Sequence, residues 1–286
     1  MAKNMIIDEL KEIVRNETQK GFSNAYIKNS LKEYLQVYIL NYIYTSDKYK
    51  QALIFTGGTC LRHCYGLNRL SEDIDFDQKT TINTNDLKRD LFDYFKKNYL
   101  YKDLKISVKQ KGRQLLLKFP VLKALELASE SESDLLYVKL DISLNESKNF
   151  QVKTTLKNLY GFNYIMLHYD LPTLMAGKIS AIFQRQRFWG KTNQETIKGR
   201  DYFDLLWYLD QKVVPNMKRV NDSIEENINL KELVNRLNKK VLLATGKFKL
   251  DLKRDLLPFI SNNLIIDDYL KSYRQNYLSK VKYLLS

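Results

Sequence analysis

Two aspartates separated by one residue stand in residues 71–76, where acidic and apolar residues alternate in the order Ser-Glu-Asp-Ile-Asp-Phe. Side chains two apart on a β-strand point to the same face, so Ser71, Asp73 and Asp75 project together while the apolar residues enter the core. Two carboxylates this close repel each other unless a cation lies between them. The pattern predicts a site for a hard divalent cation, Mg²⁺ or Mn²⁺, which prefers oxygen ligands.

A glycine turn precedes this acidic pair. The apolar residues 52–56 are followed directly by Gly57, Gly58 and Thr59, where a short helix is expected to begin. Glycines let backbone N–H groups approach a phosphate, and a helix N-terminus adds unpaired N–H groups. Alone, the turn is also compatible with an ordinary strand-to-helix connection. Opposite the aspartates it predicts a site for a metal-bound nucleoside triphosphate, with Ser71 beside the phosphates and Arg62 offsetting their charge.

A third carboxylate is needed to complete a site for two metal ions. Asp141 interrupts the apolar centre of residues 137–144, the best-formed of the later strand patterns. A lone aspartate inside a strand destabilises the fold unless it has a partner. Asp141 is therefore predicted as the third metal ligand, placed to favour an attacking hydroxyl, and the alternative is a hydrogen-bonded structural role.

A cluster of opposite charges follows later in the chain. Lys178 and Arg185 are seven residues apart on one predicted helix, and Asp201 and Asp204 are three apart on the next. Each spacing places both side chains on one helical face. One interpretation is a set of salt bridges between lobes. The other is a catalytic role, in which Lys178 and Arg185 offset triphosphate charge and an aspartate holds Lys178 in place.

The elements that must position these residues divide the chain in two. Helical periodicity is expected at 5–16, 23–46, about 59–65 and 84–100, with strands at 52–56 and 73–77. Alternation then predicts strands at 104–109, 114–119, 135–144, 151–156 and 164–168, and the helical period returns from Leu171 to the C-terminus. The expected fold is α+β and bilobed, with a mixed β-sheet domain at 1–168 and an all-helical domain at 169–286.

Composition favours folded protein with a polyanionic partner. The chain of 286 residues is 44% hydrophobic, and its 47 Lys and Arg against 33 Asp and Glu give a net charge of +14. Such a surplus attracts nucleic acid, although a Lys-rich genome would produce the same bias. Lys191, Lys198 and Arg200 are candidates for a basic track close to Lys178 in the sequence.

The two cysteines, Cys60 and Cys64, share one face of a short predicted helix. Two small core residues are expected there rather than a disulfide or half of a metal site, because the chain has only two His to serve as further ligands. No segment has the pattern of a signal peptide or of a transmembrane helix, so a cytoplasmic location without membrane contact is expected.

These motifs, in this order and spacing, resemble the AbiEii/AbiGii toxin family of nucleotidyltransferases, which includes the mycobacterial MenT toxins. The resemblance covers about residues 50–210, and its first two elements are shared with the wider DNA polymerase β-like superfamily. The matching elements are Gly57-Gly58-Thr59-x-Leu61-Arg62, Ser71-x-Asp73-Ile74-Asp75-Phe76, Gly177-Lys178-x-x-Ala181 and Arg200-Asp201-x-x-Asp204-Leu205. Many superfamily members have Gly-Ser where this chain has Gly57-Gly58, so Thr59 is the candidate for the missing hydroxyl contact.

The resemblance implies a toxin of a toxin–antitoxin or abortive phage infection system, with antiviral defence as its role and a cognate antitoxin as a possible partner. It implies metal-dependent transfer of nucleotides from an NTP to RNA, with tRNA 3′ ends as the acceptor (an EC 2.7.7-type reaction). By motif position Asp73 and Asp75 are metal ligands, Lys178 binds the triphosphate, and Asp201 or Asp204 is the essential acid. Two alternatives stay open: transfer to a protein hydroxyl, and an inactive nucleic-acid-binding relative.

Overall fold

The computed structural model describes residues 5–145, 147–185, 187–189 and 194–285. The chain forms two compact units, the first made of Met1–Asn145 and Lys153–His168 and the second of Glu146–Val152 and Tyr169–Ser286. The segment Glu146–Val152, which the sequence placed in the first domain, groups with the second unit. The two units are described one after the other.

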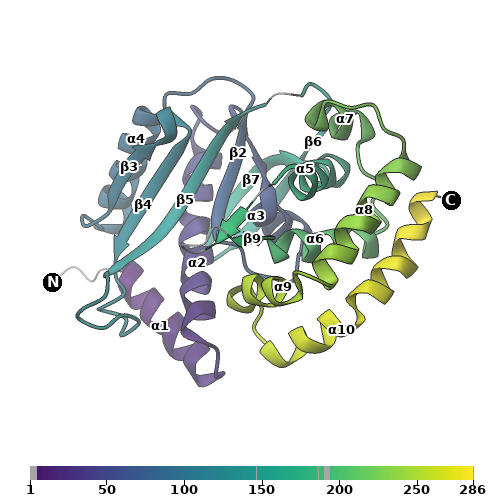
Figure 1. The fold of residues 1–286 in the computed structure, drawn as a ribbon. Coiled ribbons are helices and arrows are strands. Elements are labelled where there is room, and N and C mark those ends of the chain that lie inside the picture. The colour runs from purple at the N-terminus through teal and green to yellow at the C-terminus, as the bar shows by residue number, and fades with distance from the viewer. Residues whose placement is uncertain (1–4, 146, 186, 190–193, 286) are drawn as a thin grey trace. The chain divides into compact units, whose positions relative to one another are not determined.

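The first unit is built around a seven-stranded mixed sheet with the strand order β3-β4-β5-β2-β1-β7-β6 (Figure 1). Its strands are β1 (Leu53–Thr56), β2 (Asp73–Gln78), β3 (Lys105–Lys109), β4 (Gln114–Pro120), β5 (Leu135–Leu144), β6 (Val152–Leu159) and β7 (Phe162–Tyr169). Its helices are α1 (Met5–Gln19), α2 (Asn24–Thr45), α3 (Gly57–Tyr65) and α4 (Thr84–Tyr99), with a 3₁₀ turn, η1 (Gln110–Gly112). The central strand β2 runs antiparallel to β1 and parallel to β5.

Alternation along β2 explains how this unit presents its acidic residues. Ile74 and Phe76 are buried, and the Phe76 ring packs 5.6 Å from that of Phe55 on β1 and 6.4 Å from that of Tyr44 on α2. Asp73 and Asp75, at the alternate positions, are only partly buried. The apolar face of the strand is thus covered by the core, and the carboxylates are left on the opposite face.

The second unit is mainly helical. It contains α5 (Leu171–Gln184), α6 (Gly199–Asp210), α7 (Met217–Ile224), α8 (Leu230–Thr245), α9 (Lys249–Leu256), η2 (Leu257–Phe259), α10 (Asn263–Lys280) and η3 (Val281–Leu285). Buried residues at helical spacing, such as Leu205 and Leu209 on α6, form its core together with Tyr273, whose hydroxyl donates to the Tyr202 carbonyl at 2.7 Å. Asp170 caps α5 by accepting from the Thr173 amide, with Pro172 in the first turn.

The observed elements follow the predicted pattern closely, with one addition. A short antiparallel hairpin, β8 (Arg187–Trp189) and β9 (Gln194–Thr196), interrupts the helices of the second unit, where the sequence predicted helices throughout. A strand of three residues is too short to show a recognisable alternation of polar and apolar residues. None of the helices in the described residues combines the length and the apolar character needed to cross a membrane.

Candidate active site

The three predicted metal carboxylates meet on neighbouring strands of the first unit. Asp73 and Asp75 lie on β2, and Asp75 is paired in register with Asp141 on the adjacent β5. Because strand partners present their side chains to the same face of a sheet, Asp141 joins the other two acids there. The side chains of Asp73 and Asp141 are 25% and 29% exposed, so solvent and a ligand reach them.

A lysine that sequence reasoning missed lies between these acids. The Lys139 Nζ is 2.9 Å from Asp73 Oδ2 and 3.1 Å from Asp141 Oδ2. Burial acts to lower the pKa of Lys139, but the hydrogen bond and charge of Asp73, joined by Asp141, raise it above its ordinary value. Lys139 is opposite Asp73 in the β2–β5 register and two residues before Asp141, so the period-two pattern used for the aspartates could have found it.

The contacts of Lys139 indicate that a divalent cation fits between the acids. A positive group already bridges two carboxylates from different strands, which is the arrangement that repulsion between the acids demands. Asp141 is oriented by a further contact, since Gln114 Nε2 on β4 donates to Asp141 Oδ1 at 2.7 Å. An oxygen-rich, partly exposed group of three acids matches the ligand preference of Mg²⁺.

The glycine turn packs directly against the acidic pair. Gly57 has a φ of +76°, and a Cβ at this position would lie 2.1 Å from Asp75 Oδ2. A Cβ at Gly58 would lie 2.7 Å from Arg69 Nη2 and 3.2 Å from Ser71 Oγ. Glycine is thus required at Gly57 by both backbone conformation and space, whereas a Cβ at Gly58 would require the end of the Arg69 side chain to shift. The turn therefore lies against Asp75 and Ser71, and their contact with nucleotide stays a prediction.

Two residues predicted to bind nucleotide have other partners in the structure. The Thr59 hydroxyl donates to the Asp73 carbonyl, which ties α3 to the start of β2. Arg62 donates to both carboxylate oxygens of Glu33 on α2, at 3.0 and 3.2 Å, and to the Leu67 carbonyl. The structure therefore gives both side chains a positioning role, and their contact with nucleotide stays a prediction.

The charge cluster of the predicted catalytic lysine lies wholly within the second unit. Lys178 Nζ on α5 contacts Asp201 Oδ1 at 2.8 Å and Asp204 Oδ2 at 2.7 Å, both on α6. Arg185 also pairs with Asp201. Burial would raise the pKa of Asp201, but the charges of Lys178, Arg185 and Lys198 lower it to about 2. The predicted salt bridges exist, and they join two helices of one unit rather than two lobes.

The residues proposed as a basic track near Lys178 are, where the structure describes them, only partly exposed to solvent. Arg200 is 6% exposed, donates to Asp255, and has its guanidinium 3.9 Å from the centre of the Phe259 ring. Burial and the charge of Arg200 lower the pKa of Lys198 to about 8. Arg200 is therefore a packed structural residue, because its charge is compensated inside the helical unit. Lys191 lies outside the described residues.

Comparison with known proteins agrees with this geometry. Residues 39–271 match the family described as nucleotidyl transferase AbiEii toxin, type IV toxin–antitoxin system. A search of curated proteins finds no match.

Two solved structures share the fold of the chain. MenT4, a nucleotidyltransferase toxin from Mycobacterium tuberculosis, aligns with a TM-score of 0.54 at 12% identity, over 97% of this chain and 89% of its own. JHP933 from Helicobacter pylori aligns with a TM-score of 0.50 at 19% identity, over 90% of this chain and 93% of its own. With the family match spanning most of the sequence, the acidic strand and the glycine turn identify the chain as a member of the AbiEii family of nucleotidyltransferase toxins.

Proposed function

We propose that this protein transfers nucleotides from an NTP to RNA in a Mg²⁺-dependent reaction, with a tRNA 3′ end as the acceptor. The observation that carries the proposal is the group of Asp73, Asp75 and Asp141, held on two adjacent strands against the Gly57-Gly58 turn. This arrangement offers oxygen ligands for a divalent cation beside a glycine turn, whose backbone N–H groups suit a triphosphate.

Each part of the first unit has a defined task in this proposal. Asp73 and Asp75 hold the cation and the triphosphate attached to it, and Asp141, oriented by Gln114, lies on the side of the acceptor hydroxyl. When bound, Mg²⁺ supplies charge stabilisation for the in-line displacement and for the departing pyrophosphate. The glycine turn offers its backbone N–H groups to the phosphates, because Gly57 and Gly58 carry no side chains of their own. Lys139 leaves its bridge between Asp73 and Asp141 when the cation binds.

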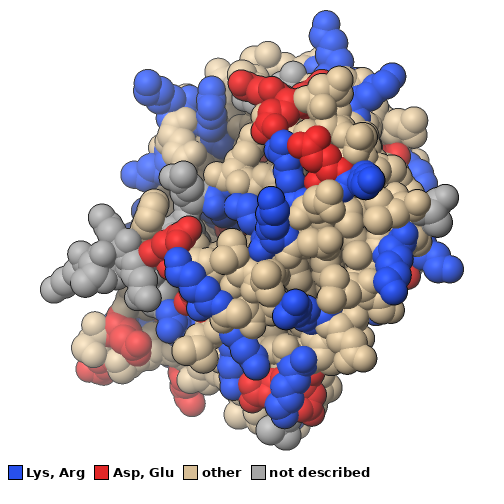
Figure 2. Space-filling view, turned by 45° about the vertical axis from the view of Figure 1, so that its right-hand side comes forward, with Lys and Arg blue, Asp and Glu red and all other residues tan. Residues whose placement is uncertain are grey.

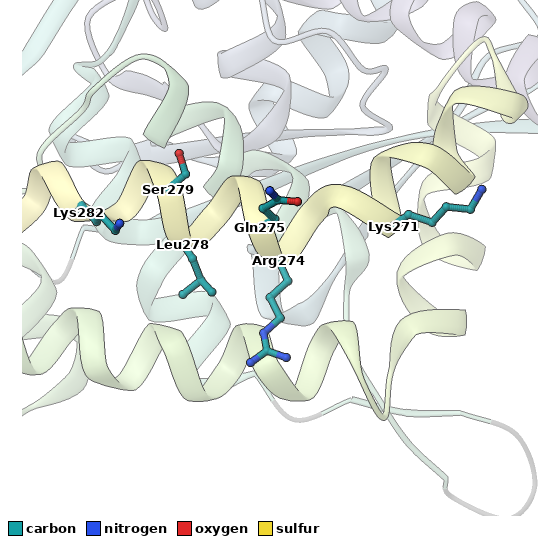
Figure 3. Close-up of a pocket in the computed structure, with 6 residues that line it drawn as sticks. All are labelled: Lys271, Arg274, Gln275, Leu278, Ser279 and Lys282. Carbon is teal, nitrogen blue, oxygen red and sulfur yellow. The ribbon is translucent and has the colours of Figure 1, made fainter.

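Positive charge on the second unit supports an RNA acceptor. A groove of about 490 Å³ runs along α10 and η3 and is lined by Lys271, Arg274, Gln275, Leu278, Ser279 and Lys282 (Figure 3). Among the described residues Arg274 and Lys282 have no ion-pair partner, so their charge is available to a phosphate backbone. Figure 2 shows Lys and Arg side chains spread over the face that it draws rather than gathered in a single patch.

Labelling with α-³²P-NTPs tests the reaction and its acceptor together. The protein is incubated with each NTP in turn, total RNA and Mg²⁺, and with intact or 3′-truncated tRNA. We expect label in intact tRNA and at least a 100-fold loss for Asp73→Asn, because the variant removes a metal ligand. Glu72→Gln is the matched control, since this neighbouring carboxylate pairs with Lys32 at 3.4 Å instead.

The distribution of label decides between the acceptors. RNA binding through phosphates should weaken steeply as salt rises, because each contact releases condensed counterions. If label appears only in protein and RNA binding does not change with salt, the acceptor is a protein hydroxyl rather than RNA. Full activity of Asp73→Asn would remove the proposed metal site altogether.

A toxin role in abortive infection predicts an effect on growing cells. Expression in a bacterial cytoplasm should arrest growth, and Asp73→Asn should relieve the arrest while accumulating to the same level. Equal arrest by both proteins would assign the effect to overexpression. Co-expression of a neighbouring antitoxin gene and copurification on a tag test whether an antitoxin binds directly.

A further inference from the structure

Three soft or borderline metal ligands, none of them one of the three acidic residues, converge in the first unit. The Sγ atoms of Cys60 and Cys64 and a ring nitrogen of His168 all lie within 4.8 Å of one another. The cysteines are one turn apart on α3, whereas His168 lies on β7 and pairs with Phe55 of β1. The chain has only two Cys and two His, so three of its four such residues meet at one point.

The separation of the three atoms suits a tetrahedral ion. With metal–sulfur bonds of about 2.3 Å, two thiolates on such an ion stand roughly 3.8 Å apart. The atoms in the structure are thus within about 1 Å of a closed coordination sphere, a distance that side-chain rotation alone can cover. Ligands at positions i and i+4 of a helix are a recurring way of presenting two donors to one zinc ion.

The surroundings supply outer contacts of the kind found around a bound ion. His168 Nε2 shares a hydrogen bond of 2.8 Å with Thr155 Oγ1, the kind of outer contact that fixes the orientation of a metal-binding imidazole. The Tyr164 hydroxyl, four residues earlier on the same face of β7, is buried and has no hydrogen-bond partner among the described residues. Its pKa is raised by burial and then by Cys64, which places it in the neighbourhood of the thiols.

Both cysteines are free in the structure, Cys60 fully buried and Cys64 partly exposed. We propose that Cys60, Cys64 and His168 bind a structural Zn²⁺ ion. Binding converts the two thiols to thiolates and releases two protons to solvent, and no oxidant or reductant is involved. Zinc is the ion that a mixed sulfur and nitrogen donor set with tetrahedral spacing prefers.

The ion would anchor the helix that begins at the phosphate turn. Gly57 and Gly58 start α3, and the first proposed ligand lies two residues beyond them. A cross-link from α3 to β7 fixes the direction of this helix relative to the sheet, in addition to the Thr59 hydrogen bond to β2. Zinc binding at this site is independent of nucleotide transfer and of its acceptor, and it is measured by metal content and thermal stability.

The test measures zinc in the full-length protein purified with Zn²⁺ and then passed over a desalting column. We expect about one zinc per chain, and Co²⁺ in its place should give the intense visible bands of a tetrahedral thiolate site. Removal by a strong chelator should lower the Tm by about 5 °C or more, and added Zn²⁺ should restore it. Mg²⁺ should not restore it, which separates this site from the acidic one.

Variants assign the ligands. Cys64→Ser, at the partly exposed position, and His168→Asn should each lose zinc and the cobalt bands while keeping a folded circular dichroism spectrum. His63→Asn is the matched control, because His63 is the other histidine, is buried on the same helix, and is not part of the cluster. Less than about 0.1 zinc per chain in the wild type, a Cys60–Cys64 disulfide, or equal zinc loss in His63→Asn would overturn the proposal.

Discussion

Asp201 offers a quantitative test of the charge cluster in the helical unit. Its side chain is 4% exposed and contacts Lys178 at 2.8 Å as well as Arg185. The surrounding cations lower the pKa of Asp201 from the ordinary 3.8 to about 2. Asp201→Asn keeps the shape of the side chain and removes the charge, while Lys178 retains Asp204 at 2.7 Å. The variant therefore isolates what the Asp201 charge contributes to stability.

The size and the pH dependence of the effect follow from the pKa shift. A fall from 3.8 to about 2 corresponds to roughly 2.4 kcal/mol of stabilisation at neutral pH, at about 1.36 kcal/mol per pKa unit. Because the folded pKa is the lower one, this contribution is complete above about pH 5 and is lost as pH falls toward 2. At pH 3 the contribution has already fallen by about 1 kcal/mol.

Thermal and urea unfolding of the wild type and Asp201→Asn, compared from pH 7 to pH 3, measures this difference. At pH 7 the Tm of the variant should be roughly 5 °C below that of the wild type. This difference in Tm should fall by nearly half at pH 3. Asp210→Asn on the same helix is the control, because its carboxylate is 41% exposed and its pair with Lys280 should contribute less than about 1 kcal/mol. A difference in Tm that does not change with pH would refute the assignment of a buried, ionised Asp201.

Three further substitutions probe the first unit. Gly57→Ala should reduce kcat/KM about 100-fold, because its Cβ would displace the Asp75 carboxylate 2.1 Å away. Lys139→Met should lower the Mg²⁺ concentration for half-maximal activity up to about fivefold, because the cation no longer competes with an ammonium group whose partly exposed ion pairs contribute about 1 kcal/mol or less. Arg62→Met should lower the Tm by a few degrees and leave the KM for NTP within about twofold, because Arg62 is bound to Glu33.

Matched positions and alternative outcomes serve as controls for these substitutions. Gly66 has the same positive φ, +75°, with no atom within 4 Å of a Cβ, so Gly66→Ala carries the backbone cost without the clash. Comparable loss of activity in both glycine variants would assign the effect of Gly57→Ala to stability. A higher Mg²⁺ requirement in Lys139→Met would contradict competition and indicate that the lysine supports the site. A tenfold rise in the KM of Arg62→Met at unchanged Tm would establish Arg62 as a nucleotide ligand.

The sequence by itself determined the order of the elements and the face on which each carboxylate lies. Strand alternation is a local property, so Asp73 and Asp75 had to share one face of β2 while Ile74 and Phe76 entered the core. Helix caps are equally local, and the Asn83 side chain caps α4 by accepting from the Asn85 amide. The family motifs could be recognised for the same reason, since their residues are close together along the chain.

Tertiary structure alone decided which distant side chains meet. The register of β5 against β2 places Lys139 opposite Asp73, and the β4–β5 pairing gives Asp141 its contact with Gln114. Folding also pairs Arg62 with Glu33, a contact that local sequence patterns do not specify.

The same holds for His168, which lies more than 100 residues from the cysteines it approaches. Local periodicity specifies the direction of a side chain but not the neighbour it reaches. Strand pairing and helix packing between remote segments supply that information, because the free energy of burying their apolar faces selects one register among the many that local patterns allow.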